Sequence, residues 1–380
     1  MANFFNRDTK VYIDDGVGIW EIPVLEDYSF SQDTEITEVE LNEMASASGA
    51  SKRGKRAFTD AFSPAEFSFS TYIRPFVSGG GGGAGDADSA ANHHAVEEVL
   101  WAKMVGLGTY VPSSYAFTNL TADTTDLDID MGGSNRVTIG TFDVYFVLNA
   151  TAVTDANYSV GAGNKIYKIS DCVLDEAQID FDVDGLAVCN WTGLGKLLTS
   201  ETAYDAGAAV TEGLASTTNY IRNKLTGLTI TADDATTYPG AGAGVYNLVL
   251  TGGSITVSNN VTFLTPQTLG SINTPFGHIT GTKEVSGNFT CYLDSGTNGD
   301  SADFLEDIAA DKATITNSFA LGFIIGGTGN TPRLEVALPT AHVKVPVHEI
   351  DDIISVDVEF MGIPSTISTA DEMTLKYVGA

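Results

Sequence analysis

The stretch "FSFSTYIRPF" at residues 67–76 alternates large apolar side chains with small polar ones, and the alternation stops at Pro75. A period of two is typical of a β-strand with one buried face, and proline interrupts a strand because it has no backbone N–H. A similar stretch, "NFTCYLD", occurs at residues 288–294. The two stretches indicate that the chain contains the same strand twice.

The similarity continues through five blocks that follow one another in the same order. The matched blocks are residues 29–37 with 254–262, Phe69 and Tyr72 with Phe289 and Tyr292, Leu100 with Leu305, 142–148 with 319–325, and 187–193 with 356–362. The separation shrinks from block to block, so the second copy has shorter connections. Strand parity is retained, and a slip by one residue would turn every side chain to the other face. We therefore interpret the sequence as an internal duplication.

Short alternating runs separated by Gly, Asn and Ser turns predict a mainly β protein. Helical periodicity is confined to "HHAVEEVLWAKMVG" at residues 93–106 and, more weakly, "SADFLEDIAADK" at residues 301–312. Because each helix follows the repeated strand, we expect two tandem domains.

The domain boundaries follow from composition. We expect a first domain at residues 1–199, a small and polar linker at 200–218, and a second, shorter domain at 219–380. Within the first domain, the Gly-rich segment 78–92 is predicted to be a flexible tether. The insert at residues 111–135 has no counterpart in the second copy and receives no role.

The charge balance excludes a nucleic-acid-binding protein, because 49 acidic and 19 basic residues give a net charge of −30. No apolar run approaches the roughly 20 residues of a membrane helix, and the first residues have no signal-peptide core. We expect a protein that is made and kept in a cytosol-like compartment, or released from one by lysis. The three cysteines, Cys172, Cys189 and Cys291, form no CxxC pair and are predicted to be buried, reduced thiols.

Two glycine-containing stretches resemble phosphate-binding loops without fitting them. "GASKRGKR" at residues 49–56 has the spacing of a nucleotide-binding loop, but Arg56 stands where Ser or Thr must hold magnesium. Two interpretations stay open: an ordinary basic surface loop, or a loop that docks on an acidic patch of a neighbouring subunit. The Gly run at residues 79–85 contains no Lys and leads into acidic residues, which favours a linker.

Candidate metal ligands are incomplete, so we expect no metal and no cofactor. The sequence has no G-x-S-x-G motif and no Cys with a convincing His partner, so we also expect no enzyme activity. His93 and His94 lie four residues before Glu97 and Glu98, which is ligand spacing on a helix, but no other His is nearby and a solvated helix start explains them. "DLDIDMGG" at residues 126–133 resembles part of a calcium loop whose Gly and final Glu are out of register, so a strand is expected.

Acidic residues gather on one face of a predicted strand. In "IDFDVDGL" at residues 179–186, three Asp side chains are expected to point one way while Ile179, Phe181 and Val183 point the other. The matching region of the second copy contains Glu349, Asp351, Asp357 and Glu359. Two readings stay open: an ordinary solvent-facing surface, or a surface selected to repel a polyanion.

Three segments resemble bacteriophage tail tube proteins: residues 51–76, 96–106 and 167–195. The resemblance implies that each of the two tandem domains is a β-sandwich or barrel-forming pair of packed β-sheets with one short flanking α-helix. It also implies protomers that join strands around a ring, so that one sheet becomes a continuous inner barrel, and rings that stack into a tube carrying the genome. Six tube domains usually complete a ring, so three chains with two domains each would suffice.

The resemblance also assigns roles to residues and partners. The candidate lumen-facing acids are Asp180, Asp182, Asp184, Asp351, Asp357 and Glu359, and the candidate inter-ring loop contains Lys52, Arg53, Lys55 and Arg56. The expected partners are further copies of the chain and other tail proteins such as a sheath, baseplate or terminator. DNA would pass through without specific binding, no membrane would be involved, and the tube would assemble in the host cytoplasm as part of the virion tail.

Two alternatives belong to other functional classes. A surface β-adhesin would bind a glycan or calcium and would need an export signal. A polysaccharide-cleaving tail protein would need an aromatic cleft with a fixed pair of carboxylates. Neither requirement is apparent in the sequence.

Overall fold

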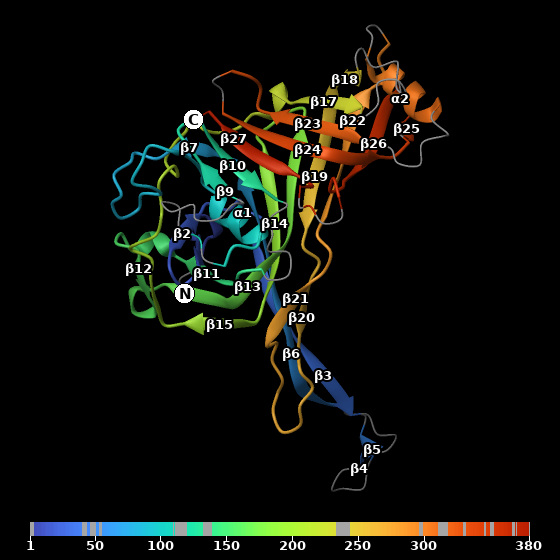
Figure 1. Ribbon diagram of the computed structural model, residues 1–380. Helices are drawn as coiled ribbons and strands as arrows, with labels where there is room; N and C mark the ends of the chain where they lie inside the picture. Colours follow the sequence, from blue (N-terminus) through green and yellow to red (C-terminus); the bar gives the residue numbers. More distant parts are fainter. Residues whose placement is uncertain are drawn as a thin grey trace.

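The computed structural model describes residues 4–39, 44–45, 51–52, 55–108, 110, 120–131, 139–232, 244–295, 299–310, 318–329, 332–345, 347–349, 353–366, 369 and 371–379. The predicted mainly β fold is confirmed. Figure 1 shows a body of stacked strands from which a long hairpin extends at one end.

One antiparallel sheet, called here the long sheet, crosses the whole molecule. Its strands pair in the order β3 (Ser29–Val39), β6 (Arg56–Tyr72), β14 (Val188–Gly195), β13 (Lys165–Asp182), β19 (Leu250–Ser258), β22 (Glu284–Tyr292) and β26 (Ser355–Gly362). The last position is shared by the end of β24 (Arg333–Val343) and by β25 (Val347–Glu349). Strands of both predicted domains therefore form a single sheet.

The strands of the long sheet are amphipathic because their side chains alternate between a packed and an open face. In β26, Val356, Val358 and Phe360 are buried, while the residues between them are exposed or half-buried. β14 has the same pattern, with Cys189 and Trp191 buried. The period of two seen in the sequence thus sets which face of the sheet enters the core.

Two outer sheets cover the packed face. The first contains β2 (Ile19–Ile22), β1 (Lys10–Asp14), β11 (Phe142–Leu148), the beginning of β13 and β15 (Leu197–Glu201). The second contains β18 (Val245–Leu248), β17 (Gly227–Ala232), β23 (Phe319–Ile325), the beginning of β24 and β27 (Thr374–Val378). Since β13 and β24 each pass from an outer sheet into the long sheet, each half is a sandwich.

The two halves share their strand order and also one irregularity. β11 and β13 slip in register between Phe142 and Val144, and β23 and β24 slip in register between Phe319 and Leu321. One detail of the sequence comparison, the match of Trp191 with Phe360, is wrong by two residues. Trp191 lies opposite Phe69, and the residue opposite the equivalent Phe289 is Val358.

Both predicted helices are present, although the first is shorter than expected. α1 spans Glu98–Met104 and α2 spans Ser301–Ala310. The residues ahead of α1 instead form β8 (His93–Ala95), which pairs with β7 (Pro75–Val77). Pro75 therefore begins a short strand of its own beyond the end of β6.

The remaining described elements are short. They are η1 (Asn6–Asp8), β4 (Met44–Ala45), β5 (Ser51–Lys52), β9 (Leu120–Ala122), β10 (Asp126–Asp130), η2 (Ala150–Ala152), β12 (Asn157–Ser159), η3 (Val160–Ala162), β16 (Ala203–Asp205), η4 (Asn223–Leu225), β20 (Val261–Leu264) and β21 (Gly277–Thr280). No helix in the described ranges is long and apolar enough to cross a membrane.

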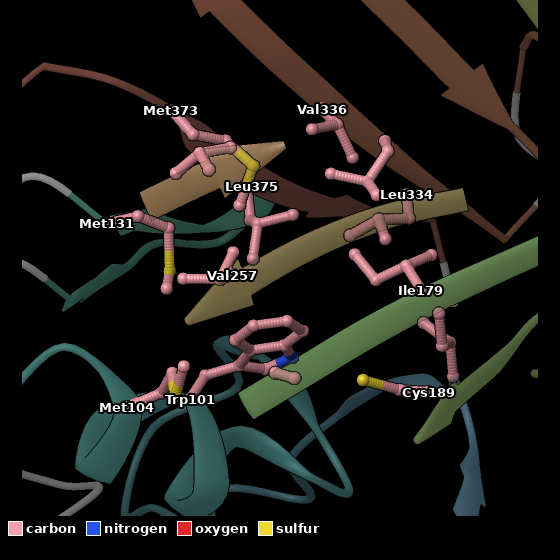
Figure 2. Close-up of a cluster of buried hydrophobic side chains, with 14 of the residues drawn as sticks. Trp101, Met104, Met131, Ile179, Cys189, Val257, Leu334, Val336, Met373 and Leu375 are labelled. Carbon is pink, nitrogen blue, oxygen red and sulfur yellow. The ribbon is translucent and has the colours of Figure 1, made fainter. Parts of the chain in front are cut away.

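The core is continuous between the halves. Figure 2 shows Trp101 of α1 and Ile179 of β13 in one cluster with Leu334, Val336 and Leu375 of the second outer sheet. The β9–β10 hairpin, which lies within the insert at residues 111–135, extends that sheet by pairing with β27. The two halves are therefore packed together and exchange strands.

The glycine-rich segment and the expected linker contact each other, so neither is a free tether. The Glu212 carboxylate accepts hydrogen bonds from the Ser78 hydroxyl at 2.9 Å and from the Ala87 N–H at 2.8 Å. Tyr204 stacks on Tyr145 with ring centroids 3.8 Å apart. Residues 200–218 therefore pack along the first half before the chain enters the second.

Candidate functional site: the open face and edges of the long sheet

Asp180 and Asp182 lie on the open face of the long sheet, as predicted, opposite the buried side chains of Ile179 and Phe181. Asp180 accepts a hydrogen bond of 2.7 Å from the Gln178 side chain and another from Asn190. The alternation ends one step earlier than expected, however. Because β13 stops at Asp182, Val183 is exposed and Asp184 lies in the following turn instead of on the strand.

The second set of acids lies on the same open face. Asp357 and Glu359 alternate with the buried residues of β26, and the Asn288 amide donates to Asp357 at 3.5 Å. Glu359 forms an ion pair with Lys344 at the far edge of the sheet. Asp351 falls outside the described residues.

Direct cross-strand neighbours join the two sets into one surface. Asp180 lies opposite Ser254, Ser254 opposite Asn288, and Asn288 opposite Glu359. The other side chains in these rows are mostly small and polar or acidic: Glu66, Ser68, Ser70, Glu176, Gln178, Asn190, Thr192, Thr256, Glu284, Ser286 and Thr290. The open face is therefore a wide polar surface whose charged side chains are mainly acidic.

The joint between the halves within the long sheet is the pairing of β13 with β19. Asp175, which sits at an irregularity of β13, accepts a hydrogen bond of 2.6 Å from the Val261 N–H through its carboxylate. Its backbone carbonyl accepts one of 2.8 Å from the Asn259 N–H. Sequence reasoning missed Asp175. The available signal was a polar pair, Asp175 and Glu176, that interrupts the alternation of this strand.

In the part of the chain that the structure describes, both ends of the long sheet are open edges: β3 pairs along one side only, with β6, and β25 pairs only with β26. β19, by contrast, is paired on both sides. Unpaired strand edges template the addition of another strand, so these two edges are surfaces where a further chain can bind.

Two hairpins extend from the same end of the long sheet (Figure 1). The β3–β6 hairpin is braced by the loop after β20, because the Phe62 N–H donates to the Asn273 carbonyl at 2.8 Å. Ile36 and Phe58 on the first hairpin and Leu269 and Phe276 on the second are exposed apolar side chains.

The structure describes part of the candidate inter-ring loop. Arg56 begins β6, and Lys55 forms an exposed ion pair of 2.9 Å with Glu38. Lys52 lies in β5, but its side chain is outside the described residues, as is the whole of Arg53.

The histidine and glutamate pair before α1 is buried, which corrects the expectation of a solvated helix start. His94 Nδ1 lies 3.0 Å from the Glu98 carboxylate, and His94 Nε2 lies 3.6 Å from Asp88. Burial opposes the charged imidazolium, but the Glu98 and Asp88 carboxylates outweigh it and raise the pKa of His94. The cluster is a buried ion pair, and the described residues hold no group of three His, Cys, Asp or Glu side chains placed for a metal.

Two smaller predictions are confirmed. Asp126–Asp130 forms strand β10 with Leu127 and Ile129 buried. All three cysteines are free and buried, and burial raises the pKa of each thiol.

Comparison with known proteins agrees with this architecture. A family model described as phage tail tube protein matches residues 40–368. Over 98% of its length the chain is 28% identical to "Tail tube protein pb6" of Escherichia phage T5, and the match spans 75% of that protein. These matches favour neither the adhesin nor the polysaccharide-cleaving alternative. The resemblance seen in the sequence is confirmed: the chain belongs to the phage tail tube protein family, whose members are structural, non-enzymatic components of the virion tail.

Proposed function

We propose that the chain is a duplicated tube subunit that closes into rings through the edges of its long sheet, and that the rings stack into a tube conducting DNA. The observation that carries this proposal is the β13–β19 joint. There the last long-sheet strand of the first half pairs with the first one of the second half, so one sheet continues from tube unit to tube unit. Repeating this joint between chains would extend the sheet around a ring.

A duplication is supported by local features that strand order alone would not require. Gly195 of β14 and Gly362 of β26 each lie against a branched side chain: an added Cβ would meet Ile169 in the first case and Leu338 in the second. Ile169 lies opposite Val144 and Leu338 lies opposite Leu321, on the strands that share a register slip. The sequence led us to propose domains at residues 1–199 and 219–380, with a linker at 200–218. These boundaries leave Gly195 and Ile169 in the first domain and Gly362 and Leu338 in the second.

The size of the sheet favours a ring of three chains. Each chain supplies eight long-sheet positions, so three chains would supply about 24 strands with six tube units of two alternating kinds. Strands spaced about 4.8 Å apart and tilted by about 40° would then close a barrel roughly 48 Å across the backbone. Such a barrel is wide enough for duplex DNA, whereas the two halves of a single chain could not enclose it.

The open face would line the channel, because the packed face is covered by the outer sheets. Asp180, Asp182, Asp357 and Glu359 would then face the DNA from a surface otherwise made largely of small polar side chains. Each cation contacting a phosphate releases counterions and strengthens binding, so a surface poor in cations lets DNA slide. Asp184 and Asp351 stay candidates for the rim of this surface.

Stacking would use the two hairpins. A contact between the end of one ring and the opposite end of the next is heterologous and does not close, so it generates a filament. The exposed apolar residues of both hairpins, together with the basic loop of Lys52, Arg53, Lys55 and Arg56, would contact the neighbouring ring. The tube would assemble in the host cytoplasm and join other tail proteins at its ends or along its outside.

Electron microscopy of the purified protein tests the ring. Rings or tubes with three-fold symmetry and six lobes are expected, and a protein that stays monomeric at every concentration would contradict the proposal. The channel is tested with Asp180→Lys combined with Asp182→Lys, against a control of Asp155→Lys with Asp205→Lys beside the first outer sheet. Preformed rings of the first variant should bind linear duplex DNA but not closed circular DNA, since threading needs an end. Equal binding of both forms would place these acids outside the channel.

A further inference from the structure

We infer that neighbouring chains join in one defined register, with Val347 of β25 opposite Ser31 of the next chain's β3. The partner is a second copy of this chain, and the inference rests on the proposed function. It goes further by specifying which backbone positions meet and by assigning Lys344 a role at the contact. The chain carries its own template for this joint, because β13 and β19 already show how one tube unit pairs with the next.

The template has a fixed register. Gln178 lies opposite Thr256, and Asp180 lies opposite Ser254, in an antiparallel pairing. Transferring it requires the equivalents of these four residues in β25 and β3.

The equivalents on the β13 side are found through the neighbouring strand, which is β14 in the first half and β26 in the second. Gln178 lies opposite Asn190, and Val347 lies opposite Asp357. Asn190 and Asp357 are equivalent because each directly precedes the residue opposite the repeated phenylalanine, Trp191 or Val358. Two residues further on, Asp180 lies opposite Val188, and Glu349 lies opposite Ser355. Val347 and Glu349 therefore occupy the positions of Gln178 and Asp180.

The equivalents on the β19 side follow in the same way. Ser254 lies opposite Asn288 of β22, and Ser29 lies opposite Ser68 of β6. In each pair the second residue, Asn288 or Ser68, directly precedes the repeated phenylalanine, Phe289 or Phe69. Ser29 thus takes the position of Ser254, and Ser31 that of Thr256. The transferred register places Ser31 opposite Val347 and Ser29 opposite Glu349.

The joint within the chain and the proposed joint between chains have different side chains at one position, which is occupied by Asp175 in the first and by Lys344 in the second. A phenylalanine ring lies over the glycine directly opposite it in both halves, Phe67 over Gly193 and Phe360 over Gly287. Leu174 lies opposite Gly193, and the backbone position opposite Phe360 belongs to Val343. The residue after Leu174 is Asp175, which binds the backbone of the second half, and the residue after Val343 is Lys344.

Lys344 suits a different neighbour from the one that Asp175 binds. Asp33 and Glu35 on β3 are exposed. In the proposed register, these two residues of the next chain would lie beside the edge that carries the largely exposed Lys344. Long side chains reach both direct and diagonal cross-strand neighbours, so Lys344 can pair with either carboxylate. Two β3 edges would instead bring like charges together, which disfavours pairing of identical edges and favours head-to-tail closure.

Disulfide trapping tests the register with a two-by-two set of variants. The pairs in register are Ser31→Cys with Val347→Cys and Ser29→Cys with Glu349→Cys. The offset pairs, Ser29→Cys with Val347→Cys and Ser31→Cys with Glu349→Cys, use the same four substitutions. Directly opposite residues lie within disulfide range, whereas diagonal Cα atoms are about 7–8 Å apart and lie beyond it. The native thiols are buried and should not compete.

Any disulfide formed by these pairs reports a contact between chains, because the two edges of one chain are about seven strand spacings, roughly 34 Å, apart. After oxidation, denaturing gels of the in-register variants should shift from a single-chain band to a ladder ending at three chains. Offset variants should remain single chains. Rings that form while offset pairs cross-link, or while no pair does, would overturn the register but leave the ring intact. Absence of rings in the unmodified protein would instead overturn the proposed function.

Discussion

The hydroxyl of Tyr377 donates a hydrogen bond of 2.8 Å to the Glu97 carboxylate, which ties the last strand of the chain to the residue before α1. The same hydroxyl accepts the Trp101 indole N–H at 2.6 Å. All three side chains are fully buried, and Trp101 also packs edge-on against Trp191. The two halves are therefore linked by a polar contact inside their shared core.

Replacing Tyr377 with Phe should destabilise the subunit without changing its packing volume. The change leaves the Trp101 N–H without its acceptor and removes one donor from Glu97, and an unsatisfied buried polar group costs about 1–3 kcal/mol. Urea denaturation of the unassembled subunit would measure the loss. Tyr292→Phe, at a half-exposed ring, is the matched control and should change the free energy of unfolding by less than about 0.5 kcal/mol. Equal stabilities of the two variants would contradict the assigned role of the contact.

Glu97 should make stability depend on pH near neutrality. Burial raises the pKa of Glu97 to about 7, against 4.5 for an ordinary glutamate. Because the folded state binds this proton more tightly than the unfolded state, the contribution favours folding below pH 4.5 and is lost as the pH rises to about 7. The free energy of unfolding should fall by roughly 3 kcal/mol across this window, relative to a Glu97→Gln variant at each pH. Parallel pH profiles for the two proteins would show that Glu97 is not the titrating group.

Much of the fold could be predicted from sequence because burial in a sheet leaves a period of two. The strands at residues 67–72 and 319–325 were identified in this way, and the repeated order predicted two similar sheet pairs. Side-chain patterns carry no information on which distant edges meet, so the β10–β27 pairing could not be foreseen. The sequence comparison also matched Trp191 with Phe360, two residues away from its structural counterpart Val358, because a shift of two keeps every residue on its own face.

The candidate site was partly predictable for a related physical reason. Asp180, Asp182, Asp357 and Glu359 were found because charged residues in an alternating strand mark its solvent face. Asp175 was missed although a polar pair interrupts the alternation of its strand, and the role proposed for Lys344 depends on the sheet edge at which it lies. The His94 cluster was misjudged since charge in a sequence suggests exposure, and only the folded chain shows that oppositely charged groups bury one another.

Gly253 should tolerate no side chain at the joint between the halves. It lies directly opposite Phe181, and an added Cβ would sit 2.5 Å from the Asn288 carbonyl oxygen and 2.8 Å from the Phe181 ring. Gly253→Ala should lower the free energy of unfolding by about 1–3 kcal/mol through overpacking. The adjacent Gly252→Ala is the control, because its Cβ would meet only ordinary contacts at 3.6 Å or more. The idea of a tight joint fails if both alanine variants denature at the same urea concentration.

The Asp15–Lys103 ion pair should be costly to break, because both side chains are completely buried at a separation of 3.2 Å. Burial opposes ionisation of Asp15, but backbone N–H groups and the Lys103 charge outweigh it and lower the pKa of the carboxylate. Asp15→Asn should destabilise the subunit by about 3–5 kcal/mol, since it leaves a buried lysine charge without its counter-ion. Glu21→Gln, which disrupts a partly exposed pair with Lys10, should cost at most about 1 kcal/mol. Thermal denaturation at pH 7 compares the two, and similar melting temperatures would contradict the distinction.

Reversing the charge of Lys344 should weaken ring formation more than folding. In the proposed register, Lys344→Glu brings a third carboxylate toward Asp33 and Glu35 of the next chain, and like charges across an interface are destabilising. Sedimentation at low salt should show fewer rings and more single chains, whereas urea denaturation should change little because Lys344 is largely exposed. Adding Asp33→Lys and Glu35→Lys to the same chain should restore the rings. Lys10→Glu, in the first outer sheet, controls for net charge. Rescue is the decisive outcome: a triple variant that remains as single chains while Lys10→Glu assembles would place Lys344 away from the neighbouring β3 edge.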